Sequence, residues 1–223
     1  AFVKFYIKNN THLIVEDKTM SDNPTDITHE RILNCSIVLF ARSGFHGVSM
    51  RQVAEAVGVT VAALYYHFKD KEELYLTAVK HIFNNRLPIS AADLREDIDP
   101  WQSLDQFIHH FIQTLVADAD FQRLLQWVLL DTDTARSQTL TDKVFAPFFA
   151  EVTWMINRIA PVQDAHLQAV SMIGLMVFPF ESSHVRRFLP GYQLPQQTPD
   201  VLTQHIINLL RGGLLGVANE SKS

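Results

Sequence analysis

The sequence predicts an all-α protein, built as a small three-helix head followed by a larger helical bundle. Apolar residues recur at spacings of three and four along most of the 223-residue chain, which is the pattern of helices with one buried face. Three helix starts with suitable capping residues fall within about thirty residues in the N-terminal third. Hydrophobic residues make up 47% of the chain, which is enough for a large core and too much for a globally disordered protein.

The stretch from Phe45 to Leu76 carries the most specific pattern. Three residues that favour the N-cap position of a helix stand within it: Ser49, Thr60 and Asp70. Gln52 and Glu73 each follow a cap by three residues, so both predict capping boxes. Only Gly58-Val59 separates the first two helices. Two short helices joined by such a glycine-containing turn form the helix-turn-helix motif, which presents its second helix to the DNA major groove.

From about Thr28 to Leu76 the chain resembles the DNA-binding domain of the TetR/AcrR family of bacterial transcriptional repressors. The resemblance rests on Phe40-Ala41, Gly44-Phe45, Val48-Ser49, Val53-Ala54, Ala56, Gly58-Val59, Leu64-Tyr65, His67-Phe68, Lys69, Lys71 and Leu74. It covers about a quarter of the chain and includes the helix that precedes the motif. It implies a TetR-like fold, with a helix-turn-helix DNA-binding domain over residues 26–74 and a ligand-binding and dimerisation bundle over residues 75–223.

The same resemblance implies which residues contact DNA. Base edges would be approached by Arg51, Val61, Ala62 and Ala63. The other expected DNA-binding residues, most of them facing the phosphate backbone, are Ser49, Thr60, Tyr65, Tyr66, His67, Lys69 and Lys71. The apolar run Val61-Ala62-Ala63 departs from the family, in which polar residues or glycine are common there. Apolar side chains can pack on thymine methyl groups but cannot form bidentate hydrogen bonds, so Arg51 is expected to carry most of the hydrogen-bonded base reading. Two adjacent tyrosines also admit a plainer interpretation, as a partly buried amphipathic pair.

Helical periodicity gives the expected elements in chain order. In the head we expect helices at about residues 28–42, 50–57 and 61–68, and a connecting helix at 71–87. In the body we expect helices at about 101–116, 121–130, 140–159, 164–180 and 199–215, with a loop over 89–100. Gly44 is expected to end the first helix in a left-handed cap, and Pro147 is expected to kink or divide the helix at 140–159.

Residues 1–25 are expected to form a flexible arm, and two interpretations of residues 1–19 stay open. They are non-native, because Met20-Ser21-Asp22-Asn23-Pro24 resembles a natural start for this family, or they are a genuine arm. Residues 2–8 nearly alternate between apolar and polar as a strand does, although one lone strand has no sheet to join.

The body is rich in large, adaptable apolar side chains. They predict either a plain bundle core or, as the resemblance implies, a cavity for a small apolar ligand, lined by aromatic residues and a few polar groups. The candidate pocket residues are Phe107, His110, Phe111, Gln126, Trp127, Phe145, Phe148, Met172 and Met176.

The last two predicted helices carry apolar stripes wide enough for two faces. The candidate interface residues are Val170, Ile173, Gly174, Val177, His205, Ile206, Leu209 and Gly213. Two such helix pairs from two chains form a four-helix bundle, and a two-fold dimer is the commonest closed arrangement. We therefore expect a homodimer.

Charge and composition narrow the function classes. The net charge is −5, but residues 28–71 hold five Lys/Arg against three Asp/Glu, while residues 72–223 hold eleven against seventeen. A basic head on an acidic body favours DNA as a partner of the head. The single cysteine, Cys35, excludes an intrachain disulfide and suits a reducing cytoplasm. No apolar run in the sequence approaches the roughly 18 residues that a membrane span needs, so no membrane partner is expected.

Catalytic and metal-binding motifs are missing from the sequence, which has no GxSxG, no glycine-rich phosphate loop and no Cys/His cluster with metal-ligand spacing. We expect no enzyme activity, no cofactor and no metal. The leading hypothesis is a homodimeric, cytoplasmic transcriptional repressor that leaves a palindromic double-stranded DNA operator when a small apolar ligand enters the body. Two alternatives stay open: an activator or global regulator with the same head, and a small-molecule-binding helical protein or enzyme with an unused helix-turn-helix.

Overall fold

Residues 24–87, 98–159 and 164–220 are described by a computed structural model of the chain, and every regular element in them is helical. The all-α prediction is confirmed. The expectations for residues 1–19 and for most of the loop at 89–100 fall outside the described residues. Within the described ranges, no helix is both long enough and apolar enough to cross a membrane.

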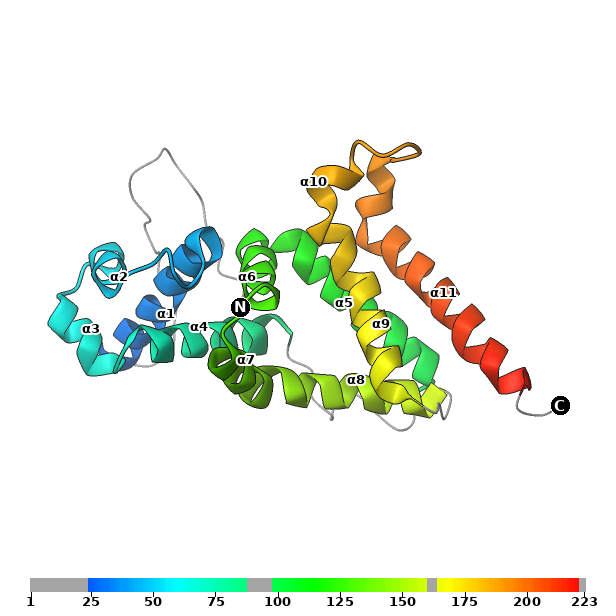
Figure 1. The fold of residues 1–223 in the computed structure, drawn as a ribbon, viewed down its shortest axis with the longest axis horizontal. Coiled ribbons are helices and arrows are strands. Elements are labelled where there is room, and N and C mark those ends of the chain that lie inside the picture. Colours follow the sequence, from blue (N-terminus) through cyan, green and yellow to red (C-terminus); the bar gives the residue numbers. More distant parts are fainter. Residues whose placement is uncertain (1–23, 88–97, 160–163, 221–223) are drawn as a thin grey trace.

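Four helices build the head and its connection to the body: α1 (Pro24–Ser43), α2 (Met50–Val57), α3 (Val61–His67) and α4 (Lys71–Arg86). Figure 1 shows α2 and α3 at one end of the molecule and α4 running from the head towards the body. Ile32 and Phe40 of α1, Val53 of α2 and Leu64 of α3 are all fully buried and belong to one apolar core. The short helices of the head are held by this core, because isolated helices of seven or eight residues are not stable in water.

The predicted caps of α2 and α3 are present. The Ser49 hydroxyl accepts from the Gln52 amide at 3.3 Å, and the Gln52 side-chain carbonyl accepts from the Ser49 amide at 2.8 Å. Thr60 Oγ1 accepts from the backbone amide of Ala63 at 3.1 Å. Both helix starts of the motif therefore have the local geometry that the sequence predicts.

The cap of α4 differs from the prediction by one residue. Asp70 Oδ1 accepts from the Glu73 amide at 2.8 Å, as expected. The Glu73 carboxylate, however, accepts from the Lys69 amide at 2.7 Å instead of from the amide of the cap residue itself. The reciprocal pair still satisfies two backbone donors at the helix start, so the helix begins where the sequence places it.

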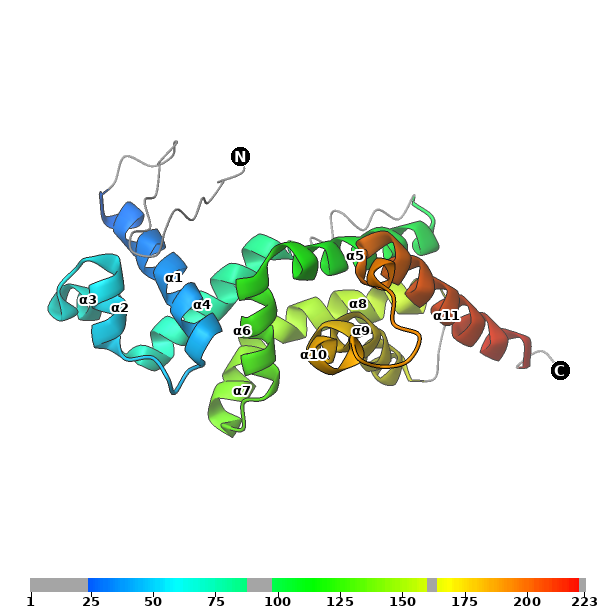
Figure 2. The ribbon, with the colours of Figure 1, turned by 90° about the horizontal axis from the view of Figure 1, so that it is seen from above.

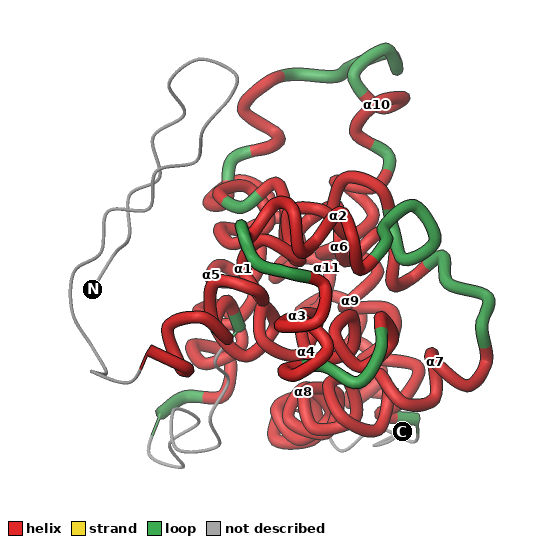
Figure 3. Tube along the Cα trace, turned by 90° about the vertical axis from the view of Figure 1, so that its left-hand side faces the viewer, coloured by secondary structure: helices red, strands yellow, loops and turns green. Residues whose placement is uncertain are grey.

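The body contains α5 (Pro100–Ala117), α6 (Ala119–Leu129), α7 (Thr134–Leu140), a π-helical segment η1 (Thr141–Phe145), α8 (Ala146–Ile159), α9 (Ala165–Glu181), α10 (Ser183–Arg186), a 3-10 turn η2 (Leu194–Gln197) and α11 (Pro199–Glu220). Seen from above, α6 crosses between the head and the rest of the body (Figure 2). The short helix α10 and the loop after it project from the body (Figures 1 and 3).

The expected helix at 140–159 changes to π-helical geometry just before Pro147, although the chain stays helical from Thr134 to Ile159. The π-helical segment η1 precedes α8, and the Ala146 amide donates to the Thr141 carbonyl across it. Pro147 is the second residue of α8 and has no N–H to donate to the preceding turn. Helix α7 was not expected, because its polar sequence shows no apolar stripe; Asp133 caps it by accepting from the Arg136 amide at 3.0 Å.

The C-terminal end of α4 is tied to the body by polar contacts. Arg86 Nε lies 2.7 Å from Asp118 Oδ2, and Asp118 also caps α6 by accepting from the Phe121 amide at 2.9 Å. His110 Nε2 of α5 lies 3.1 Å from the Arg86 carbonyl oxygen. Helix α4 therefore ends against both α5 and α6.

Candidate nucleic-acid interface and ligand site

The outer face of α3 carries exposed aromatic side chains. Leu64 is fully buried and anchors the helix, whereas Tyr66 is 84% exposed, Tyr65 is 50% exposed and Val61 is 38% exposed. The plainer interpretation of the tyrosines as a partly buried pair therefore does not hold for Tyr66. A large, solvent-facing aromatic side chain with a hydroxyl group is well suited to contact a partner.

The neighbouring expected DNA-binding residues lie on the same end of the molecule. Arg51 at the start of α2, and Thr60, Ala62 and Lys69 around α3, are exposed. Ser49 is also exposed, while Ala63 and His67 are half-buried. The His67 ring lies 5.5 Å from the Tyr66 ring and 6.0 Å from the His29 ring. Figure 3 views the molecule from this end, with α3 facing the reader.

Lys71, which is expected to meet a phosphate, bonds to its own chain in this structure. Its Nζ donates to two backbone carbonyls of the turn between α1 and α2, those of Phe45 and Val48, at 3.0 Å each. The same Nζ lies 4.2 Å from the centroid of the Phe45 ring. Burial, and secondarily the nearby Arg136 charge, lower the pKa of Lys71. The ammonium group is therefore engaged within the protein, and the expected phosphate contact of Lys71 stays a prediction.

Three of the candidate pocket residues meet in the body. The rings of Phe107, Phe111 and Phe148 lie 5.9–6.2 Å apart, centroid to centroid. Phe107 and Phe111 are almost fully buried and Phe148 is half-buried. Phe145 packs its ring 5.3 Å from that of Phe83, on α4. Phe107, Phe111 and Phe148 thus form an aromatic cluster that joins α5 and α8, and Phe145 of η1 contacts α4 separately.

A small cavity of about 90 Å³ lies beside this cluster, between α4 and the start of α8. It is lined by Phe83, Asn84, Leu87, Val144, Pro147, Phe148 and Glu151. Drug-sized ligands occupy pockets of roughly 300–1,000 Å³. A ligand of that size would have to separate α4 from α8 to enter here, and that movement would bear directly on the helix that carries the head.

The other candidate pocket residues lie elsewhere. Met172 and Met176 are fully buried in the bundle core, and Gln126 hydrogen-bonds the Glu181 carboxylate. His110 is exposed and bonded to α4. Trp127 is 42% exposed, and its Nε1 donates to the Ala41 carbonyl of α1 at 3.1 Å. His110 and Trp127 both connect the body to α1 or α4, and neither lines the cavity beside the aromatic cluster.

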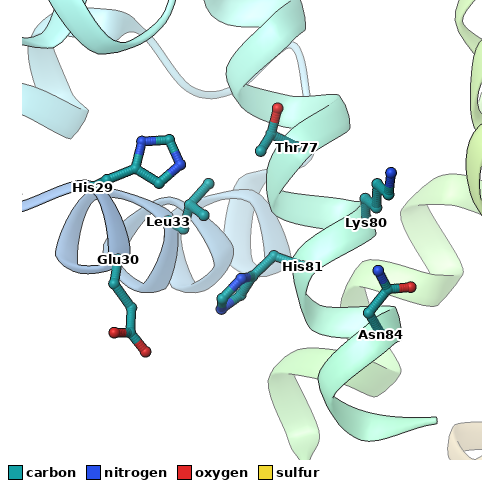
Figure 4. A pocket seen from close by; sticks show the side chains of 7 residues that line it. All are labelled: His29, Glu30, Leu33, Thr77, Lys80, His81 and Asn84. Atoms are coloured by element: carbon teal, nitrogen blue, oxygen red, sulfur yellow. The ribbon is translucent and has the colours of Figure 1, made fainter. Parts of the chain in front are cut away.

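A second cleft, of about 440 Å³, lies between α1 and α4. It is lined by His29, Glu30, Leu33, Thr77, Lys80, His81 and Asn84. Figure 4 shows the rings of His29 and His81 turned towards the space between the two helices. Sequence reasoning missed this cleft, because its residues are spread over two helices and share no motif spacing. Its rim is polar, unlike that of the expected ligand pocket.

An apolar face runs along α9 and α11. Of the candidate interface residues, Val170 is 47% exposed, Leu209 is 48% exposed, and Gly174, His205 and Gly213 are also exposed, while Ile173 is half-buried. Val177 and Ile206 are corrected, because they are 6% and 0% exposed and pack into their own chain. The face is extended by large exposed residues that the sequence did not single out: Leu167, Phe178 and Val201.

The described residues contain no group of three His, Cys, Asp or Glu side chains placed to hold a metal ion. Burial raises the pKa of the Cys35 thiol, which opposes the thiolate form that a nucleophile needs.

Comparison with known proteins agrees with this geometry. The family model of the bacterial regulatory proteins of the tetR family matches residues 32–78, which is the head and the first half of α4. The chain is 36% identical over 144 residues to the HTH-type transcriptional regulator RutR of Escherichia coli (strain K12). The chain belongs to the TetR family. That alignment covers 61% of this chain and 66% of RutR, so it spans about two thirds of the relative's length.

A second curated relative matches less of the chain, whereas two solved structures match more of it. The biofilm operon icaADBC HTH-type negative transcriptional regulator IcaR of Staphylococcus epidermidis is 27% identical over 103 residues, covering 46% of this chain and 53% of IcaR. Among solved structures, the fatty acid degradation regulator FadR from Bacillus halodurans matches with a TM-score of 0.69 at 16% identity, covering 87% of this chain and 98% of FadR. FadR from Bacillus subtilis, solved with stearoyl-CoA, matches with a TM-score of 0.69 at 15% identity, covering 82% and 97%. These structural likenesses show the fold.

Proposed function

We propose that this TetR-family protein is a DNA-binding transcriptional regulator that reads an operator through α2 and α3. The observation that carries the proposal is the outer face of α3, where Tyr65 and Tyr66 stand in solvent beside Lys69 while Leu64 holds the helix in the core. Protein–DNA contacts combine phosphate-binding groups, which set position, with base-edge contacts, which set specificity. This face offers both kinds of group.

Arg51 is the proposed base-reading residue. It is exposed on the first turn of α2, and its guanidinium can bind a guanine edge with two hydrogen bonds. Val61, Ala62 and Ala63 open α3 and can pack on thymine methyl groups. The hydroxyls of Tyr65 and Tyr66, the Lys69 ammonium and the exposed Ser49 are proposed to meet phosphates, with Thr60 and His67 beside them.

We propose a homodimer held through α9 and α11. The exposed apolar residues of these helices, Val170, Leu209 and their neighbours, would otherwise remain in water. A two-fold dimer places two identical heads on one DNA, and its operator is then palindromic. A regulator of chromosomal DNA acts in the cytoplasm.

The body is proposed to bind a small apolar ligand that releases the DNA. Support comes from the aromatic cluster of Phe107, Phe111 and Phe148 and from the cavity that adjoins it. One structural neighbour was solved with stearoyl-CoA, whose acyl chain is apolar, so this fold accepts such a group. A ligand that opens the contact between α4 and α8 would change the separation of the two heads. IcaR is named a negative regulator, and we propose repression here too.

The test is a binding selection with purified protein and fragments of its own genomic DNA. We expect a small set of fragments to be enriched, and we expect an apolar compound related to the neighbouring genes to weaken their binding. By linkage, those fragments must weaken binding of the compound by the same factor. Binding of all fragments alike, at every salt concentration, would contradict sequence-specific recognition. Suppose that fragments are enriched, but that no apolar compound releases them and calorimetry detects none bound. The proposal of DNA binding would then stand, and the proposal of an apolar ligand would be overturned.

A further inference from the structure

The turn between α1 and α2 is held by two residues of the body. This turn, residues 44–49, leads directly into the Ser49 cap of α2 and so belongs to the head. Two residues of the body, Trp127 of α6 and Arg136 of α7, contact this turn. These contacts join residues more than eighty positions apart in the sequence, and they connect the head to the body at a point other than α4.

Trp127 fits against a glycine. A Cβ atom added to Gly44 would lie 2.9 Å from two atoms of the Trp127 ring, which is closer than real Cβ contacts. The Trp127 Nε1 donates to the Ala41 carbonyl at 3.1 Å, within the last turn of α1. The body therefore touches both the end of α1 and the turn that follows it.

Phe45 is the next residue in the turn, and two cationic side chains lie over its ring. Lys71 Nζ is 4.2 Å, and Arg136 Cζ 4.0 Å, from the centroid of its ring. Lys71 belongs to the start of α4 and Arg136 to α7. A cation over an aromatic ring contributes about 0.5–2 kcal/mol, more when the pair is desolvated. Both α4 and the body thus contact one aromatic ring.

Arg136 is a rigid anchor for this contact. Its residue is 2% exposed, and its Nε and one terminal nitrogen pair with the two carboxylate oxygens of Asp131, whose side chain is 9% exposed. A third nitrogen lies 3.6 Å from Asp133 Oδ2. Bidentate pairing of this kind fixes the plane of a guanidinium. The position of Phe45 therefore depends on the position of the segment from Asp131 to Arg136.

That segment continues towards the cavity. Helix α7 passes directly into the π-helical segment η1 and then into α8. Val144 of η1 and Phe148 of α8 line the cavity of about 90 Å³, together with Phe83 of α4 and Leu87 just after it. Single π-helical turns inside helices are frequent at functional sites. One continuous stretch of packed helix thus runs from the cavity wall to Arg136.

We propose that Arg136 and Trp127 are positioning residues that set the orientation of the DNA-reading head by gripping the Gly44–Phe45 turn. Arg136 acts through Phe45, and Trp127 acts through Gly44. Movement of α7 shifts the turn, and the turn carries α2 and α3 with it. The body thus controls the head through two connections, the turn and α4. This inference rests on the proposed function for its biological role, but the contact itself can be tested without DNA.

The first experiment is hydrogen exchange on the full-length protein. Phe45→Leu removes the aromatic face and keeps an apolar side chain, whereas Phe45→Tyr keeps the ring. We expect Phe45→Leu to speed amide exchange in residues 44–49 and in α2 by about tenfold, and Phe45→Tyr to restore slow exchange. The matched control is Phe149→Leu, the same change at a half-buried position of α8 whose ring meets only His166, at 5.0 Å, among the ring contacts found. Unchanged exchange in Phe45→Leu, or the same local increase in Phe149→Leu, would overturn the inference.

The second experiment uses the DNA recovered in the genomic selection, as a full palindrome and as an isolated half-site. A misplaced head still binds one half-site, so Phe45→Leu should weaken full-palindrome binding about tenfold and leave half-site binding unchanged. Equal weakening of both DNAs would mean damage to the reading surface and would overturn positioning. If the wild-type protein selects no sequence at all, the proposed function fails. The exchange experiment alone then tests whether the body holds the turn between α1 and α2.

Discussion

The three cations of the helix-turn-helix stretch, Arg51, Lys69 and Lys71, stand in different surroundings. Arg51 and Lys69 are exposed, and Lys71 is bonded to two backbone carbonyls of the preceding turn. Residue type alone would give the two lysines the same role. The structure separates their surroundings, and the Lys71 ammonium would lose its bonds to these carbonyls if it turned to a phosphate.

Arg51 and Lys69 should differ in what they do for DNA binding. Arg51→Ala should cost about 1–3 kcal/mol of binding free energy and flatten preference at one base position in each half-site. Lys69→Ala should weaken all sequences alike and lower the slope of log affinity against log salt by about one. Fluorescence anisotropy with matched and single-substituted operators, at several salt concentrations, measures both effects. The same sequence-independent loss in both variants would contradict this division of roles.

The Asp131–Arg136 pair should make stability depend on acid. Hydrogen bonds from Arg136 lower the pKa of Asp131 below its ordinary value of about 4. A carboxyl group with a depressed pKa in the folded state adds stability above its unfolded pKa, and that stability is lost as pH falls through the folded pKa. Urea unfolding should therefore show wild type more stable than Asp131→Asn at pH 7, with the difference shrinking below about pH 4. Asp142→Asn, at an exposed position, is the control and should show no comparable difference. A gap that stays constant down to pH 2 would disprove the linkage.

At the residue scale, the sequence predicted the helix caps, which form between residues close together in the chain. It missed the contacts between residues far apart in the chain. The caps at Ser49 and Thr60 follow from residues three positions apart, and both were predicted correctly. The partners of Lys71 and Trp127 lie 23–26 and 86 positions away, and no local pattern encodes them. Trp127 was therefore expected in a ligand pocket, although its ring lies on the end of α1 and the turn after it.

At the scale of elements, the two left-handed glycines of the head separate backbone strain from contact with the body. Gly44 has φ +65° and Gly58 has φ +79°, so a side chain at either position is strained by about 1–2 kcal/mol. A Cβ on Gly58 meets nothing within 4 Å, whereas one on Gly44 meets the Trp127 ring at 2.9 Å. Gly44→Ala should therefore lower the free energy of unfolding more than Gly58→Ala. Chemical denaturation measures the free energy of unfolding of both variants. An equal decrease in the two would mean that the Trp127 ring moves aside without destabilising the fold.

Element boundaries were predicted best where a chain feature stops a helix. Gly44 ends α1 as expected, and the irregularity expected at Pro147 is the π-helical segment just before it. Helix α7 escaped prediction because its seven residues are mostly polar and its burial comes from Arg136 and Leu140 alone. The short turns α10 and η2 were also missed, since four-residue helices carry no periodic signal.

At the scale of the whole molecule, the proposed dimer has a test that leaves the single chain undisturbed. Gly174 is exposed on α9, and a Cβ added there meets nothing within 4 Å, so Gly174→Leu should fold normally. If α9 packs against a partner, the new side chain should separate the two chains, and light scattering should report a monomer. Affinity for a full palindrome should then fall by roughly 10²-fold or more, because the second half-site is no longer held by the same particle. Gln113→Leu on the exposed side of α5 is the control. A Gly174→Leu dimer of unchanged mass would place the interface elsewhere.

The measurement that most directly tests two identical heads reading one DNA is a binding selection from a random double-stranded library, using the purified protein and its Arg51→Ala variant. The wild-type protein should enrich a two-fold symmetric sequence whose half-sites are centred about 10–10.5 base pairs, or a multiple of that, apart. The variant should enrich the same spacing with one position in each half-site relaxed. Enrichment of no sequence, or of a single unsymmetric site that Arg51→Ala leaves unchanged, would contradict it.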